Sequence, residues 1–175
     1  MWGLNKDPYL QIADEDLRLL SVFDDLKFDR ADADMLSPAM RNHAIQKLGP
    51  LGFKLSSGCM ILHADTGVRI LMPKSHALGA SPFDIARYTQ RRAQDYYLLT
   101  PTQAACQIID EYSTDDAYLK IADLIRKHPI NIYRMFDYLE RKPAHQKFRD
   151  ALGGLKKLQR EAVSSEPLCR RRALG

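Results

Sequence analysis

The stretch from Leu36 to Pro73 constrains the fold most, because it combines a helix start, a helix stop and a hairpin signal. Ser37 is a favourable N-cap, and Pro38 suits the first helical position, where its missing N–H is not needed. Apolar residues then recur at helical spacing: Met40, Ala44, Ile45 and Leu48. Gly49-Pro50 ends the pattern. The stretch therefore predicts a helix over residues 37–48.

Two apolar runs follow this helix, Cys59–His63 and Val68–Met72, and the link between them contains Asp65 and Gly67. Asp and Gly in a short link between such runs indicate a β-hairpin. A helix with a polar outer face directly before a hairpin resembles the second half of a winged helix-turn-helix unit. Residues 37–48 would then be the recognition helix, and the hairpin would be the wing.

The residues before this unit also fit that order. Asp14-Glu15-Asp16 are suited to the first turn of a helix, where acidic side chains favour the positive end of the helix dipole. Leu17, Leu20 and Phe23 would supply its buried face, and a short second helix is expected from residue 30 or 31 to Leu36. The predicted fold class is α+β, mainly α, with an N-terminal winged helix-turn-helix domain followed by a helical domain.

The second half of the chain contains several N-cap signals, which predict that it is mainly helical. Tyr96–Leu99 is a short β-prone run, which predicts either a third strand beside the hairpin or an extended connector. Helices are expected to start at Ser81-Pro82, Thr100-Pro101, Ser113 or Thr114, Asn131 and about Ala144. We expect four segments: a flexible arm (1–11), a winged-helix domain (12–80), a helical domain (81–162) and a basic disordered tail (163–175).

A second helix-turn-helix candidate spans Ala117–Arg141, where two helical patterns flank the turn His128-Pro129. Such a pair could place a helix in a major groove, but any helical bundle with short turns shows the same pattern. The surrounding block is acidic. We interpret it as packing or dimerisation structure.

Charge is distributed in blocks. Residues 1–36 carry four Lys or Arg and nine Asp or Glu, whereas residues 37–95 carry eight and three. Residues 96–140 are again acidic, and residues 141–175 are basic and include Arg170-Arg171-Arg172. Basic blocks that coincide with a predicted recognition unit and with a tail favour phosphate contacts. Solvated faces carry such blocks as well.

Within the first candidate, three side chains suit base edges: Arg41, Asn42 and Gln46. Four cations suit phosphate contacts: Lys47, Lys54, Arg69 and Lys74. Arg69 on the wing could instead enter a minor groove. Each of these residue types is also common on an ordinary surface helix. As a set they favour binding of duplex DNA.

No catalytic constellation is visible in the sequence. It contains no Gly-rich phosphate loop, no nucleophile elbow and no paired histidines with metal-ligand spacing. A paired-carboxylate nuclease is disfavoured because Asp65 lies in a turn and the flanking strands hold no other acid. We expect no enzymatic activity, no cofactor and no metal.

Composition places the chain among ordinary globular proteins. Cys59, Cys106 and Cys169 are widely spaced and odd in number, which favours reduced thiols in the cytoplasm. No apolar run reaches the roughly 18–20 residues of a membrane span, and the N-terminus lacks the pattern of a signal peptide.

A winged unit followed by a helical domain that contains the run from Tyr96 to Ala104 is similar to antitoxin-type transcriptional regulators, and mobile elements encode many regulators of this size. The resemblance implies autoregulation and a protein partner. We therefore predict a DNA-binding transcriptional regulator that acts as a homodimer, because two half-sites multiply a weak affinity. The alternative is a protein-interaction adaptor that uses a winged-helix fold without nucleic-acid binding, whose interface would be the acidic first helices.

Overall fold

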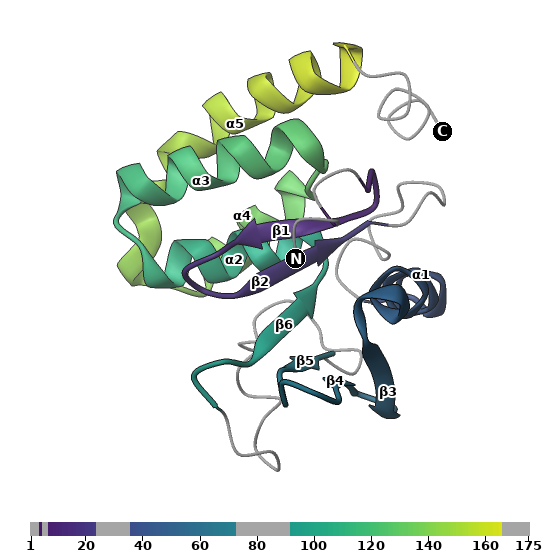
Figure 1. Cartoon of the computed structure of the whole chain (residues 1–175). Helices are drawn as coiled ribbons and strands as arrows, with labels where there is room; N and C mark the ends of the chain where they lie inside the picture. Colours follow the sequence, from purple (N-terminus) through teal and green to yellow (C-terminus); the bar gives the residue numbers. More distant parts are fainter. Residues whose placement is uncertain (1–3, 5–6, 24–35, 73–91, 166–175) are drawn as a thin grey trace.

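The computed structural model describes residues 4, 7–23, 36–72 and 92–165, and its centre is a six-stranded mixed sheet (Figure 1). The strands lie in the order β1-β2-β6-β5-β4-β3. Their bounds are β1 Leu10–Asp14, β2 Leu19–Val22, β3 Phe53–Ser57, β4 Met60–His63, β5 Arg69–Leu71 and β6 Tyr96–Leu99. The sheet therefore has two edges, β1 and β3.

The sheet consists of two antiparallel units that are joined by a strand from further along the chain. Strands β1 and β2 form one hairpin, and β3, β4 and β5 form an antiparallel meander. Strand β6 lies between the two units and pairs in parallel with both β2 and β5. Tyr97 is thus opposite Leu19 on one side and opposite Leu71 on the other.

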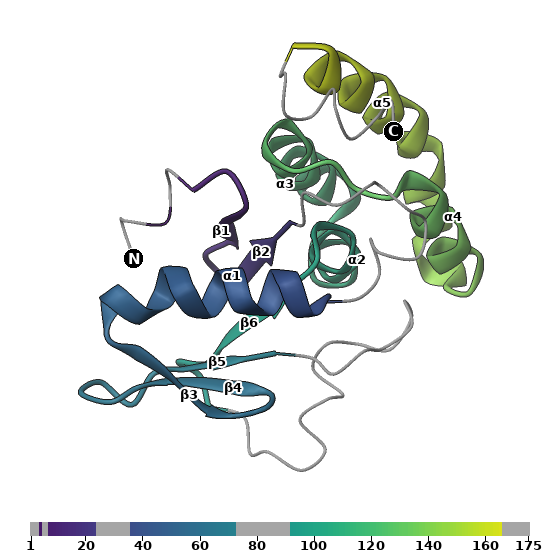
Figure 2. The ribbon, with the colours of Figure 1, turned by 90° about the vertical axis from the view of Figure 1, so that its right-hand side faces the viewer.

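Helices cover both faces of the sheet (Figure 2). Side chains alternate across a strand, so neighbouring residues enter different cores. Leu20, Ile70 and Leu98 pack with helix α1 (Pro38–Leu48) in one core. The adjacent Leu19, Leu71 and Leu99 pack in the other core, against α2 Pro101–Glu111, α3 Thr114–Lys127, α4 Ile132–Glu140 and α5 Gln146–Ser165. The result is a three-layer arrangement with the sheet in the middle.

The helix boundaries follow local capping chemistry. Ser37 caps α1 by accepting a hydrogen bond from the Met40 amide at 3.2 Å, and Thr100 and Asn131 cap α2 and α4 in the same way. The 3₁₀ turn η3 (Gly49–Leu51) ends α1 as the Gly-Pro pair predicts. The 3₁₀ turn η5 (Pro143–His145) separates α4 from α5. The predicted helix starts at 37, 100, 113 and 131 are confirmed.

The predicted winged helix-turn-helix is wrong. The described residues of its expected first helix, 14–23, instead contribute the end of β1, a turn and β2, which pairs with β1 as a hairpin. Asp14 initiates the turn by accepting the Leu17 amide at 2.8 Å, and Arg18 adopts a left-handed φ of 55°. All four residues of β2 are buried because the strand is covered on both faces. An apolar run of this kind does not distinguish a helix from a central strand.

The hairpin interpreted as a wing does form, but not as a projecting flap. Strands β4 and β5 pair as predicted, with Ile61 opposite Ile70. They lie inside the sheet between β3 and β6, so they are not available to a DNA groove as a wing. The third strand expected at Tyr96–Leu99 is confirmed. The expected short helix at 30–36 and the helix at 81–92 fall almost entirely outside the described residues, and the domain boundaries stay predictions.

The N-terminal segment is anchored to α1. Leu4 is buried in the α1 core. The Asp7 carboxylate accepts hydrogen bonds from the amides of Tyr9 and Leu10, both at 2.8 Å. It also lies 2.9 Å from His43 and 3.0 Å from Lys47 on α1. Asp7 therefore connects the start of β1 to the outer helix.

Candidate functional site

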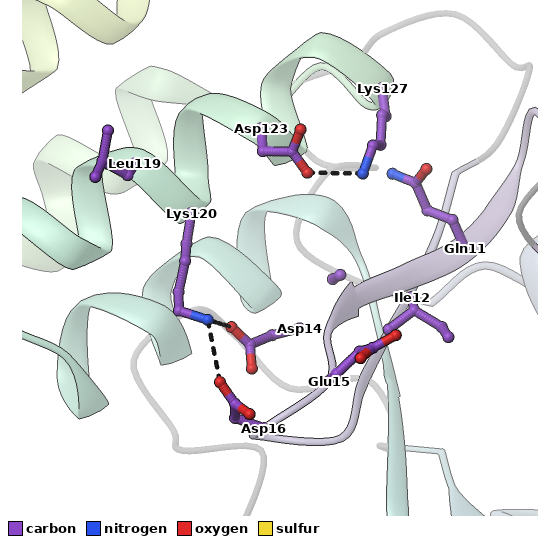
Figure 3. A pocket seen from close by; sticks show the side chains of 10 residues that line it. Gln11, Ile12, Asp14, Glu15, Asp16, Leu119, Lys120, Asp123 and Lys127 are labelled. Atoms are coloured by element: carbon purple, nitrogen blue, oxygen red, sulfur yellow. Dashed lines mark hydrogen bonds and ion pairs between the residues drawn. The ribbon is translucent and has the colours of Figure 1, made fainter.

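A trough with a volume of about 730 Å³ lies between β1, which is an edge strand of the sheet as described, and helix α3 (Figure 3). One wall is formed by consecutive residues of β1 and the following turn, 11–16. Consecutive strand residues point to opposite faces, so a hollow that all of them line lies beside the edge of the strand. The other wall is a single face of α3: Leu119, Lys120, Asp123 and Lys127.

Asp14 is the buried anchor of this trough. Its carboxylate accepts from Lys120 Nζ at 2.8 Å and from the Tyr112 hydroxyl at 3.1 Å (Figure 3 shows the lysine contact). Lys120 Nζ also lies 4.4 Å from the centre of the Tyr112 ring. Burial alone would lower the pKa of Lys120, but the hydrogen bonds to Asp14 and Tyr112 outweigh it and raise that pKa. Lys120 is therefore firmly cationic and neutralises Asp14.

The rim of the trough is predominantly acidic. Asp123 and Lys127 form an exposed ion pair of 2.7 Å along α3 and cancel each other. Asp16 is 3.4 Å from Lys120, a cation already engaged by Asp14. Glu15 is exposed and makes no ion pair with any residue that the structure describes. Four carboxylates face two ammonium groups, so the trough favours a cationic ligand.

A buried amide also faces the trough. Gln11 is 9% exposed, and its Nε2 has no acceptor among the described residues. Its side chain extends from β1 towards the Lys127 end of α3 (Figure 3). A buried donor without an acceptor costs about 1–3 kcal/mol. A ligand that brought a carbonyl oxygen to Gln11 would recover part of that cost.

The residues predicted to contact bases lie on α1. Asn42 and Gln46 are exposed. Arg41 is half-buried, and its guanidinium donates to the Gly58 carbonyl at 3.2 Å, which ties α1 to the β3–β4 turn. Burial lowers the pKa of Arg41 from its ordinary value. These side chains share one helix, but Arg41 is engaged by the backbone of its own fold.

The predicted phosphate contacts are dispersed. Lys54 is exposed on the edge strand β3, and Lys47 is exposed but paired with Asp7. Arg69 is buried and forms a bidentate pair with Asp95, with 2.9 Å from Nε to Oδ1. Lys74 lies outside the described residues. In this arrangement Arg69 is not on the surface, so neither a phosphate nor a minor groove can reach it.

The Arg69–Asp95 pair stabilises the sheet instead. Burial would raise the pKa of Asp95, but hydrogen bonds from Arg69 and from the Arg92 amide outweigh it and lower that pKa. The pair joins the first residue of β5 to the residue before β6. It therefore sets the register of the parallel pairing at the centre of the sheet.

Sequence reasoning missed the trough because its two walls are far apart in the chain. Asp14 and Lys120 are separated by 106 residues. The acidic run Asp14-Glu15-Asp16 is visible in the sequence, but on its own it predicts a helix start. On α3 the spacing of Leu119, Asp123 and Lys127 marks one helical face. That pattern was available, although nothing in it indicates which strand it faces.

No group of three His, Cys, Asp or Glu in the described parts of the chain is placed to hold a metal ion. Within those same parts, no helix combines the length and apolar character needed to cross a bilayer. Comparisons with models of known families, with characterised proteins and with solved structures return no match.

Proposed function

We propose that this protein is a protein-interaction module that binds a basic segment of a partner protein in the trough between β1 and α3. The observation that carries the proposal is a mainly acidic hollow beside the edge strand β1, with the buried side-chain amide of Gln11 facing it. Leu119 is 66% exposed on the α3 wall and offers an apolar contact next to the charges.

The first experiment measures binding of two capped nonapeptides by fluorescence polarisation. One alternates valine and lysine, and the other alternates valine and glutamate. We expect the lysine peptide to bind, with an affinity that falls as NaCl rises, because exposed charges are screened by salt. The glutamate peptide should not bind. A lysine peptide that binds more weakly than about 1 mM would overturn the proposal.

A matched pair of variants locates the binding. Glu15→Gln removes a rim carboxylate that no described residue pairs with, and should weaken the lysine peptide about 2–5-fold, the size typical of one exposed charge pair. Glu161→Gln removes an exposed carboxylate of α5 that does not line the trough, and should leave binding unchanged. Equal effects of both substitutions would mean that general charge, and not the trough, attracts the peptide.

A second candidate function is duplex DNA binding by the outer surface of α1 and β3, as a homodimer. One observation favours it: residues 37–64 contain Arg41, Lys47 and Lys54 but no Asp or Glu. Asn42 and Gln46 are exposed on the same helix and could reach base edges. This route needs no wing, but it does need the helix itself to enter a groove.

A gel shift with the DNA upstream of the protein's own gene tests this candidate. Lys54→Ala should weaken binding to all sequences and reduce the slope of log affinity against log salt by about 1. Asn42→Ala should instead relax sequence preference. If the protein shows no retention on duplex DNA at low salt, the DNA-binding candidate fails and the protein-interaction proposal is unaffected.

A further inference from the structure

We infer that the partner segment binds in an extended conformation and adds to the open edge of β1 as a seventh strand of the sheet. This inference rests on the proposed function and specifies how the trough recognises its ligand. Addition of a strand to a sheet edge satisfies main-chain groups on both sides, and pockets for alternate side chains supply specificity.

The register of β1 shows which groups are available. The Phe23 amide donates to the Tyr9 carbonyl at 2.7 Å, so Tyr9 belongs to a hydrogen-bonded pair with β2. Hydrogen-bonded pairs alternate along an antiparallel ladder, and Gln11 opposite Ser21 is the next such pair. The main-chain groups of Leu10 and Ile12 therefore point away from β2, towards the open edge.

The available edge is short and has defined ends. At one end the Leu10 amide is occupied, because it donates to the Asp7 carboxylate at 2.8 Å. At the other end the register shifts between Ile12 and Asp14, and the turn begins. Three main-chain groups remain in line: the Leu10 carbonyl, and the amide and carbonyl of Ile12. A partner would form its ladder over three or four residues centred opposite Ile12.

The two sheet edges differ in a way that favours β1. Strand β3 carries the exposed Lys54 within its ladder, a feature that discourages strand addition, whereas a register shift near one end is common to both edge strands. Strand β1 carries no charge before Asp14, and α3 overhangs it without filling the space beside it. Within the described residues, the edge strand without a charge in the middle of its ladder is thus the one beside the trough.

Side chains of an added strand would meet different partners on its two faces. Those directed towards α3 would meet the Gln11 amide, Leu119 and the acidic rim. A lysine or arginine at the end of the segment next to the turn would reach Glu15. We therefore expect the partner to supply an extended segment in which apolar residues alternate with cationic ones, and the cationic side chains face the acidic rim.

The test uses the same valine–lysine nonapeptide, methylated on one backbone nitrogen at a time, together with amide hydrogen exchange of the protein. In strand addition, methylation should weaken binding at least tenfold at alternate central positions and have little effect at the positions between them. Saturation with the unmodified peptide should slow exchange of the Ile12 amide at least tenfold. The main-chain amide of Gln11 faces β2 in either state, so its exchange serves as the internal reference.

The possible results distinguish a failure of strand addition from a failure of peptide binding in the trough. If the peptide binds but methylation shows no alternation and Ile12 exchange does not change, strand addition is wrong and the proposed function stands. If the peptide does not bind, the proposed function fails and the inference fails with it. If the protein is a dimer in sedimentation that the peptide dissociates, a second copy occupies the edge, and the assignment to a different partner is overturned.

Discussion

Asp7 offers the sharpest test of how the N-terminal segment is held. Its side chain is 5% exposed and contacts two α1 side chains, His43 and Lys47. Burial would raise its pKa, but hydrogen bonds from His43, from Lys47 and from the amides of Tyr9 and Leu10 outweigh burial and lower the pKa from 3.8 to about 2. The substitution Asp7→Asn keeps the shape and one acceptor oxygen, and it removes the charge.

The size of the effect follows from this shift. At 1.36 kcal/mol per pKa unit, a change from 3.8 to about 2 stabilises the folded state by about 2 kcal/mol at neutral pH. The folded pKa is the lower one, so the stabilisation is complete above the unfolded pKa and is lost as the pH falls through the folded pKa. We expect Asp7→Asn to cost about 2 kcal/mol at pH 7 and only about 1 kcal/mol at pH 3.

Urea unfolding at pH 7 and pH 3, followed by circular dichroism, measures both numbers. Asp65→Asn is the control, because Asp65 lies exposed in the β4–β5 turn, and its stability should stay within about 0.5 kcal/mol of the wild type. The reasoning is refuted if Asp7→Asn costs less than about 0.5 kcal/mol at pH 7, or if its cost is the same at both pH values.

Two further predictions concern the helices and the sheet. Gly153→Ala should raise the free energy of unfolding by up to about 1 kcal/mol, because the added Cβ meets nothing within 4 Å and alanine favours the helix. Gly154→Ala should gain less, since its Cβ would lie 2.9 Å from the Tyr118 hydroxyl; thermal melts compare the two, and equal gains would contradict this packing. Arg69→Met should cost about 3–5 kcal/mol in urea unfolding because it leaves the Asp95 charge buried and unpaired, and the double variant Arg69→Met/Asp95→Leu should recover part of the loss. A double variant no more stable than Arg69→Met would contradict that explanation.

The sequence correctly predicts those elements whose boundaries depend on residues close together in the chain. Ser37 and Thr100 cap helices whose first turns lie directly behind them, so three or four residues specify each start. The hairpin of β4 and β5 is likewise set by the short turn at Asp65 and Gly67. These elements were predicted with nearly correct bounds.

The error at residues 10–22 has a different cause. A short run of apolar residues occurs both in buried strands and in amphipathic helices, so it does not distinguish them. Leu19, Leu20 and Val22 are buried because β2 pairs with β6 and is covered by helices on both faces. The strand that pairs with β2 and makes it a central strand, Tyr96–Leu99, lies more than 70 residues later in the chain. No pattern within the segment contains that information.

The candidate site was beyond sequence reasoning for the same reason. Of the residues proposed for DNA, Asn42, Gln46 and Lys54 are exposed as that role requires, whereas Arg69 was misplaced because its partner Asp95 is 26 positions away. The trough depends on a strand edge and on a distant helix face. Its acidic residues were visible in the sequence, but their position beside an open edge was not.

The central position of β6 also determines the order in which this sheet can be completed. The two antiparallel units formed by residues 10–22 and 53–71 share no ladder until Tyr96–Leu99 is inserted between them. During synthesis, therefore, each unit leaves the ribosome with an apolar inner strand exposed, β2 in one and β5 in the other. Such unpaired strands are prone to aggregation, so a ribosome that stalls before residue 96 would release a chain that misassembles with its neighbours.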